Sequence, residues 1–94
     1  MQLDPIEWNP DKDDLLCQKF GFGFERVLDA IDEGAIVAIR DHPNRANYGH
    51  QKQMIVKMDG YAWIVPFVVR ERGIFLKTMF PSRVETKRFI GGIQ

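Results

Sequence analysis

The 94-residue sequence predicts an α+β fold, in which two N-terminal helices pack on a roughly four-stranded antiparallel sheet and a short C-terminal helix follows. Two patterns favour this class. Apolar residues recur at spacings of three and four in the first third of the chain, whereas the part after residue 50 consists of apolar runs separated by short turns. A chain of this length buries one core, so we expect a single domain over residues 1–94.

Two helices are expected before residue 35. Asn9 and Pro10 suit the cap and the first position of a helix over about residues 10–20, and the glycines of the 21–23 stretch end it. A second helix is expected over residues 24–33, where the apolar residues are spaced at three and four.

Four strands are expected, at residues 35–39, 51–58, 61–69 and 74–80. Residues 41–49 form a polar loop between the first two, and Asp59-Gly60 is a strong hairpin signal between the next two. Pro66 cannot donate to a ladder, which predicts either a bulge or a backbone position that faces an unpaired side. Residues 3–8 are expected as an extended edge segment, because Pro5 argues against a central strand.

The last helix is expected over residues 83–89. Ser82 can cap it, and Glu85 stands at the third helical position, as in a capping box.

The composition is that of a soluble globular protein, with 45% hydrophobic and 28% charged residues. The single cysteine excludes an internal disulfide and favours a reducing, cytoplasmic location. The sequence contains no apolar run of membrane-spanning length, so we expect no membrane association. His42 and His50 lack zinc-site spacing and no glycine-rich phosphate loop is present, so neither a metal nor a cofactor is expected.

The zero net charge hides an asymmetry. Residues 1–34 hold nine acidic and three basic residues, whereas residues 70–94 hold six basic and two acidic ones. Two interpretations follow: the C-terminal part forms an anion-binding face, or the two parts neutralise each other across the fold.

Four cations come from consecutive elements and are expected close together: Arg70, Arg72, Lys77 and Arg83. Arginine forks match phosphate, and Lys77 can stabilise charge or donate a proton in RNA cleavage at a 2′-hydroxyl. Lys77 is expected to share a strand face with Phe75 and Met79. The aromatic residues Tyr61, Trp63 and Phe80 either stack bases or lie in the core. His50 is the acid–base candidate at neutral pH, although a solvated loop histidine is the more common case.

Three patches of the chain resemble the BrnT family of small bacterial toxins, whose fold is similar to that of the RelE ribonucleases. Residues 6–12, IEWNPDK, resemble the family's opening "(F)EWDPxK". Residues 19–25, KFGFGFE, resemble "KHGVSFEEA", with Phe20 in place of the usual histidine. The ERG sequence at 71–73 and the SRVETKR sequence at 82–88 resemble the family's "ERG … SARKATRRE" ending.

The resemblance implies a cytoplasmic, metal-independent ribonuclease toxin that cuts RNA and slows growth. It also implies a cognate antitoxin that neutralises the toxin, often with a DNA-binding ribbon-helix-helix domain. The expected catalytic residues are Lys77, Arg83, Arg72 and His50, and the expected RNA-binding residues are Trp8, Lys19, Arg45, Arg70, Thr86 and Lys87. The candidate base is either His50 or Lys19. Residues 41–51 match the BrnT family poorly. The residue that corresponds to the family's basic residue in this region is Arg45, His42 or His50.

Two other functions fit the same sequence. One is a non-enzymatic module whose basic face binds RNA or a protein. The other is a toxin that inhibits a topoisomerase, as the ParE branch of the RelE-like fold does.

Overall fold

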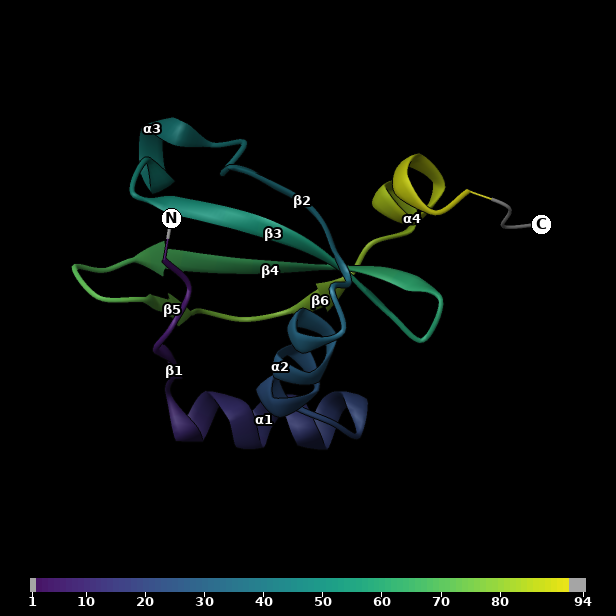
Figure 1. Ribbon diagram of the computed structural model, residues 1–94, viewed down its shortest axis with the longest axis horizontal. Coiled ribbons are helices and arrows are strands. Elements are labelled where there is room, and N and C mark those ends of the chain that lie inside the picture. Colours follow the sequence, from purple (N-terminus) through teal and green to yellow (C-terminus); the bar gives the residue numbers. More distant parts are fainter. Residues whose placement is uncertain (1, 92–94) are drawn as a thin grey trace.

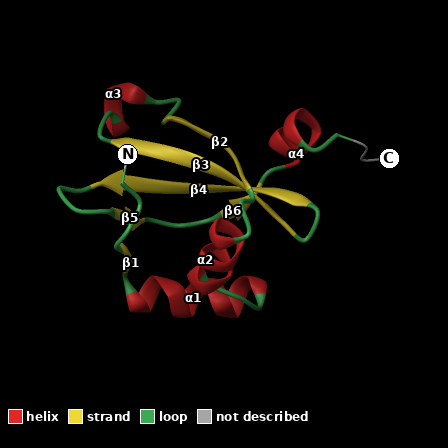
Figure 2. Ribbon diagram, viewed as in Figure 1, coloured by secondary structure: helices red, strands yellow, loops and turns green. Residues whose placement is uncertain are grey.

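The computed structural model describes residues 2–91, and its class is α+β (Figures 1 and 2). Within that range the chain forms six strands and four helices. The strands are β1 (Ile6–Trp8), β2 (Ile36–Asp41), β3 (Gln51–Met58), β4 (Tyr61–Val69), β5 (Ile74–Leu76) and β6 (Phe80–Pro81), and the helices are α1 (Pro10–Phe20), α2 (Phe24–Asp32), α3 (Arg45–Tyr48) and α4 (Arg83–Phe89). No helix of this range is both long and apolar enough to cross a membrane.

The first helix begins and ends at the residues that the sequence indicates. The Asn9 side chain accepts hydrogen bonds from the backbone N–H groups of Asp11 and Lys12, and Pro10 takes the first helical position. Gly21 ends α1 in the left-handed conformation, with φ of 85°, and donates its N–H to the Cys17 carbonyl oxygen.

The strands form a mixed sheet in the order β1-β5-β4-β3-β2, and β6 pairs with β4. β1 runs parallel to β5, whereas the other pairings described within residues 2–91 are antiparallel. The prediction of about four antiparallel strands therefore undercounts the sheet. Residues 6–8 contribute the extra edge strand, which pairs with a segment far away in the sequence.

The strand predicted over residues 74–80 is divided into two short strands, and Pro66 explains the division. The ladder between β4 and β5 runs from Val69 opposite Ile74 to Phe67 opposite Leu76. Lys77 then donates its N–H to the Pro66 carbonyl oxygen, at 2.9 Å, but proline has no N–H to donate in return. The ladder stops there, so residues 77–79 lie outside a strand and pairing resumes with β6.

The loop predicted over residues 41–49 contains the short helix α3. The Asn44 side chain caps this helix by accepting a hydrogen bond from the Asn47 N–H, at 3.3 Å.

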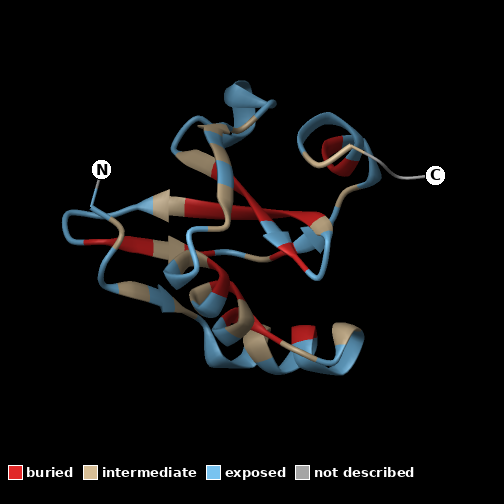
Figure 3. Ribbon diagram, turned by 45° about the vertical axis from the view of Figure 1, so that its right-hand side comes forward, coloured by how far each residue is buried: buried red, intermediate tan, exposed pale blue. Residues whose placement is uncertain are grey.

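The two faces of the sheet differ in what covers them. α1 and α2 pack on one face and form the main core with apolar residues of β3, β4 and β5. A smaller cluster of Ile55, Ala62 and Ile64 lies on the opposite face, where Ile90 at the end of α4 packs against it. Figure 1 shows α4 set apart from α1 and α2, and Figure 3 shows buried residues concentrated in the central strands. We call the side opposite α1 and α2 the open face; α4 covers it only in part.

Candidate nucleic-acid interface

Strand register places two rows of side chains on the open face. In the first row, Gln51 on β3 pairs with Val68 on β4, Val68 pairs with Phe75 on β5, and Phe75 pairs with Glu7 on β1. Because paired residues share a face and neighbouring residues alternate between faces, this row lies opposite the helix-covered core.

The second row begins at the other edge of the sheet. Arg40 on β2 pairs with Gln53 on β3, and Gln53 pairs with Pro66 on β4. Lys77 continues the row through its backbone hydrogen bond to Pro66. Gln53 lies two residues before Ile55, which belongs to the cluster on the open face, so the row shares that face.

Phe75 lies between two cations. The Arg70 guanidinium carbon is 4.3 Å from the centroid of the Phe75 ring, and the Lys77 Nζ is 5.5 Å from it. Both cations are exposed and the ring is half-buried. The Glu7 carboxylate approaches Arg70 to 4.0 Å at the β1 edge. A flat ring with two flanking cations can stack a nucleic-acid base and hold the phosphates beside it.

Arg40 forms the centre of a second polar group on the same face. Its Nε donates to the Gln53 Oε1 at 3.0 Å, and its Nη1 donates to the Glu85 Oε2 at 2.5 Å. The Arg88 Nη1 lies 3.4 Å from the other carboxylate oxygen of Glu85. One buried carboxylate of α4 therefore holds two guanidinium groups near the surface.

The start of α4 adds exposed cations beside this face. Arg83 is the first residue of the helix and Lys87 lies one turn later, and both side chains are exposed. The Ser82 hydroxyl caps the helix by accepting a hydrogen bond from the Glu85 N–H at 3.1 Å, as the sequence predicts. The other half of the predicted capping box is absent from residues 2–91, because the Ser82 N–H donates to the Ala62 carbonyl oxygen and the Glu85 carboxylate turns to Arg40.

Thr86 has a structural role that does not fit the prediction of RNA contact. Its side chain is fully buried, and its hydroxyl accepts a hydrogen bond from the Ala62 N–H at 2.9 Å and donates to the Ser82 carbonyl oxygen at 2.6 Å. The bond from Ala62 attaches α4 to the start of β4, and the bond to Ser82 lies within the first turn of α4. An RNA cannot reach this hydroxyl without displacing the helix.

Trp8 and Lys19 lie on the opposite side of the sheet from Phe75. The Trp8 ring packs 5.5 Å from that of Phe24 in the main core, because its neighbour Glu7 occupies the open face. The Lys19 Nζ lies 5.2 Å from the Phe20 ring, and Phe20 packs against Trp63 in the same core. The structure therefore does not bring these two residues to the surface that carries Lys77.

Two further residues of the predicted set lie on α3 and in the turn that follows it. Arg45 on α3 contacts the Asp41 carboxylate at 3.2 Å. A hydrogen bond from Lys52 and the positive charges of Lys52 and Arg45 lower the pKa of Asp41 below its ordinary value. His50 is exposed in the turn before β3.

Arg72 and His42 complete the predicted basic positions. Arg72 is exposed in the turn between β4 and β5. The His42 ring stacks on Tyr48 at 4.4 Å, and its Nδ1 accepts a hydrogen bond from the Asn44 N–H. The two contacts of His42, with Tyr48 and Asn44, do not bring a base close to a phosphate-binding group.

The aromatic residues that the sequence singles out divide between the core and the surface. Trp63 is buried against Phe20 and Phe22, and Tyr61 packs against the same core. Phe80 on β6 is 39% exposed and pairs with Ile64, so it lies on the open face. Met79 is buried in the main core, so the prediction that it shares a face with Lys77 is wrong, whereas Phe75 does share that face.

Sequence patterns give little indication of Arg40 and Glu85 as members of this surface. Arg40 follows a short apolar run, and Glu85 has the spacing of a capping residue. Strand alternation from Lys77 identifies Phe75, but only the sheet register identifies Arg40 as a neighbour of Gln53.

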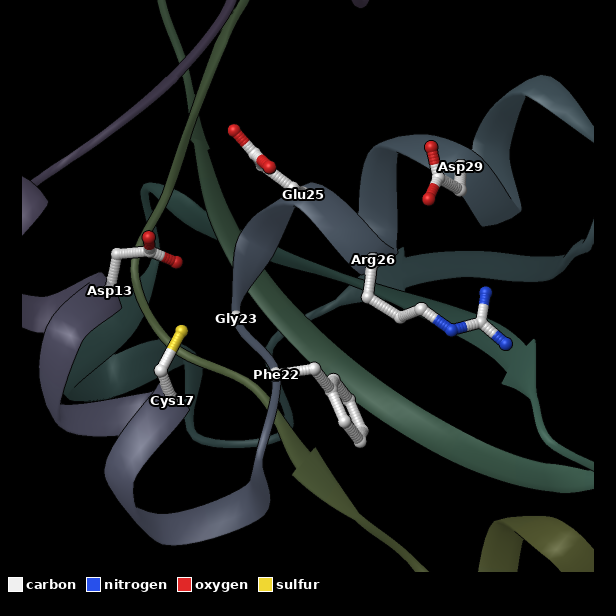
Figure 4. Close-up of a pocket in the computed structure, with 7 residues that line it drawn as sticks. All are labelled: Asp13, Cys17, Phe22, Gly23, Glu25, Arg26 and Asp29. Atoms are coloured by element: carbon white, nitrogen blue, oxygen red, sulfur yellow. The ribbon is translucent and has the colours of Figure 1, made fainter.

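A hollow between α1 and α2 has the opposite electrostatic character. Its lining comprises Asp13, Cys17, Phe22, Gly23, Glu25, Arg26 and Asp29, and Figure 4 shows Asp13 and Cys17 facing the start of α2. Desolvation and the carboxylates of Asp13, Asp14 and Glu25 raise the pKa of the Cys17 thiol above its ordinary value. The thiol is therefore a poor nucleophile at neutral pH. Among residues 2–91, no three His, Cys, Asp or Glu side chains are grouped to hold a metal ion.

Comparison with known proteins gives no match from which a function can be transferred. No protein-family model matches the chain, no curated protein is significantly similar to it in sequence, and no solved structure is significantly similar to it in fold.

Proposed function

We propose that this protein is a BrnT-like toxin with a RelE-like fold that binds and cleaves RNA on its open face. The observation that carries the proposal is the position of Phe75 between Arg70 and Lys77, on the side of the sheet opposite α1 and α2. An aromatic ring with two neighbouring cations suits single-stranded RNA, whose bases are free to leave the stack and whose phosphates need positive charge.

The proposed chemistry uses amino-acid side chains alone. Lys77 stabilises the charge of the pentavalent phosphate or protonates the leaving oxygen, and Arg83 and Arg72 bind the phosphate. His50, which is exposed in the turn before β3, serves as the base in this proposal. This set needs no cofactor.

The toxin setting comes from the resemblance of the sequence to the BrnT family. In this setting the protein acts in the cytoplasm, and a cognate DNA-binding antitoxin of the ribbon-helix-helix kind neutralises it. The open face is the surface that such an antitoxin would have to block.

The exposed lysines Lys77 and Lys19 provide a matched test. Each Nζ lies over a phenylalanine ring, at 5.5 Å and 5.2 Å respectively, but Lys77 is on the open face and Lys19 on α1. Induced expression of the wild type is expected to arrest growth, and the purified protein is expected to cleave RNA in the presence of a chelator. Lys77→Ala is expected to lower the cleavage rate by about 100-fold, the lower end of what one acid–base group contributes.

Lys19→Ala is the control, and it is expected to cleave within about twofold of the wild type because surface substitutions remote from a site have little effect. Equal losses in the two variants would contradict the assignment to the open face. Normal growth on expression of the wild type would contradict the toxin proposal itself. Growth arrest without RNA cleavage would instead favour action on a topoisomerase.

A non-enzymatic RNA-binding module is the second candidate. It is favoured by the place of His50, the predicted base, which lies in a turn outside the two rows of the open face. This candidate predicts RNA binding that depends on Lys77 without cleavage at any substrate concentration.

A further inference from the structure

We propose that Arg40 binds a backbone phosphate of the RNA, and that Gln53 and Glu85 are positioning residues that hold its guanidinium group ready. This inference rests on the proposed function, because it assumes that RNA occupies the open face. It adds a phosphate-binding position at the β2 edge of that face, at the far end of the row that ends in Lys77.

Three elements fix the guanidinium group. Arg40 belongs to β2, and its Nε bonds to Gln53 on the neighbouring β3 at 3.0 Å. Its Nη1 bonds to Glu85 on α4, which lies 45 residues further along the chain. A side chain held from two directions loses little conformational freedom when it binds a ligand, so less of the binding free energy is lost.

The bonds leave donors available at the surface. A guanidinium group has five N–H donors, and the contacts with Gln53 and Glu85 occupy two of them. The Arg40 side chain is 31% exposed, whereas the Glu85 side chain is 4% exposed. The guanidinium side chain is therefore more accessible to an approaching anion than the carboxylate that holds it.

The local charge also favours an anion. Glu85 contacts both Arg40 and Arg88, so this group of one carboxylate and two guanidinium groups carries a net positive charge. In a capping box the Glu85 carboxylate would accept a hydrogen bond from the Ser82 N–H, but this N–H donates to the Ala62 carbonyl oxygen. The helix is capped by Ser82 alone, and the carboxylate remains available to orient Arg40.

The competing interpretation is a purely structural ion pair that ties α4 to the sheet. Substitutions at Arg40 that keep or remove the charge separate the two interpretations. Arg26 provides the control, because it pairs with Asp59 at 2.7 Å and its side chain has the same 31% exposure, but it lies on α2.

The test measures binding of a fluorescein-labelled, single-stranded RNA 12-mer of mixed sequence at several salt concentrations. Arg40→Lys keeps the charge but loses the paired N–H donors of the guanidinium group. We therefore expect about five- to tenfold weaker binding with an unchanged salt dependence. Arg40→Gln removes one phosphate contact, so the slope of log K against log salt is expected to fall by about 0.7. Arg26→Lys and Arg26→Gln are expected to bind like the wild type.

Gln53→Leu tests the positioning role without any change of charge. It removes the acceptor of the Arg40 Nε–H, and we expect about two- to fivefold weaker binding at an unchanged salt slope. The folded fraction of each variant is measured by urea denaturation at the assay temperature, and affinities are compared per folded molecule.

Wild-type affinity in Arg40→Lys, together with an unchanged slope in Arg40→Gln, would overturn the phosphate-binding role and leave the structural ion pair. Wild-type affinity in Gln53→Leu would overturn the positioning role. Failure of the wild type to bind the RNA would overturn the proposed function and this inference together, so the two kinds of failure are distinguishable.

Discussion

The Thr86 hydroxyl is one of the groups that attach the C-terminal helix to the sheet. The Thr86 Oγ1 accepts the Ala62 N–H, which has no other partner among the hydrogen bonds described on that side of β4. The Ser82 carbonyl oxygen, in contrast, also receives the Thr86 N–H at 3.0 Å, so it keeps a donor if the hydroxyl is lost. The bond to Ala62 is therefore the one whose loss leaves a buried backbone group unsatisfied.

Thr86→Val tests this role at nearly constant shape. It is expected to lower the free energy of unfolding by about 1–3 kcal/mol, because the buried Ala62 N–H loses its acceptor. Urea denaturation measures this loss, with Thr86→Ser, which keeps the hydroxyl, as the control. The RNA affinity per folded molecule should not change. If Thr86→Val is stable but no longer binds RNA, Thr86 contacts the RNA and the purely structural role is wrong.

Residue-level patterns identify caps well and long-range partners poorly. The capping roles of Asn9 and Ser82 follow from sequence, because a cap bonds only to its immediate neighbours. The carboxylate of Glu85 shows why local patterns do not predict long-range partners. Its spacing from Ser82 fits a capping box, but the partner that it takes, Arg40, belongs to a strand whose position no local pattern specifies.

At the scale of elements, α1 caps α2. The Asp13 Oδ1 accepts a hydrogen bond from the Phe24 N–H at 2.7 Å, across the turn that contains Gly23. A Cβ atom at position 23 would lie 2.1 Å from that oxygen, so a side chain there would displace the Asp13 carboxylate from its capping position. The pair can then pack on the sheet as one unit.

Asp13→Ala is expected to destabilise the protein by about 0.5–2 kcal/mol, the usual cost of losing a helix cap. Asp14→Ala is the matched control, since it removes the same charge from the next position of α1, where the side chain is exposed. Thermal or urea denaturation of both variants measures the difference. If the two variants are equally stable, Asp13 does not act as the cap of α2.

The hairpins of the sheet and the edge position of residues 6–8 could be predicted from the sequence, but the partner and the direction of that edge strand could not. The Asp59-Gly60 hairpin and the interruption at Pro66 follow from local chemistry. Lys77 bonds to the Pro66 carbonyl oxygen, and between the pairs Phe67–Leu76 and Ile64–Phe80 the segment opposite β4 contains one extra residue, as at a bulge. The parallel pairing of β1 with β5 joins segments 68 residues apart, as in Ile6 opposite Ile74. It also requires Gly73, because a Cβ atom there would lie 1.9 Å from the Pro5 carbonyl oxygen.

At the scale of the whole molecule, the chain separates acidic and basic surfaces. Six of the nine acidic residues before residue 35 lie on α1 and α2, but Glu7 lies on β1, where its carboxylate approaches Arg70 to 4.0 Å. The cations of the C-terminal third lie around β5 and α4. The sequence left open whether these parts neutralise each other. The sheet lies between the helix pair and the open face, so Arg70 and Lys77 do not pair with the carboxylates of α1 and α2 among the contacts described in residues 2–91.

Ultraviolet cross-linking tests most directly whether the open face is the RNA-binding surface. Labelled single-stranded RNA is cross-linked to the wild-type protein, and the modified peptides are identified by mass spectrometry. Cross-links are expected on β5 and the segment after it, where Phe75 and Lys77 lie, and on Phe80. Cross-links confined to residues 10–32, on α1 and α2, would contradict the placement of the interface.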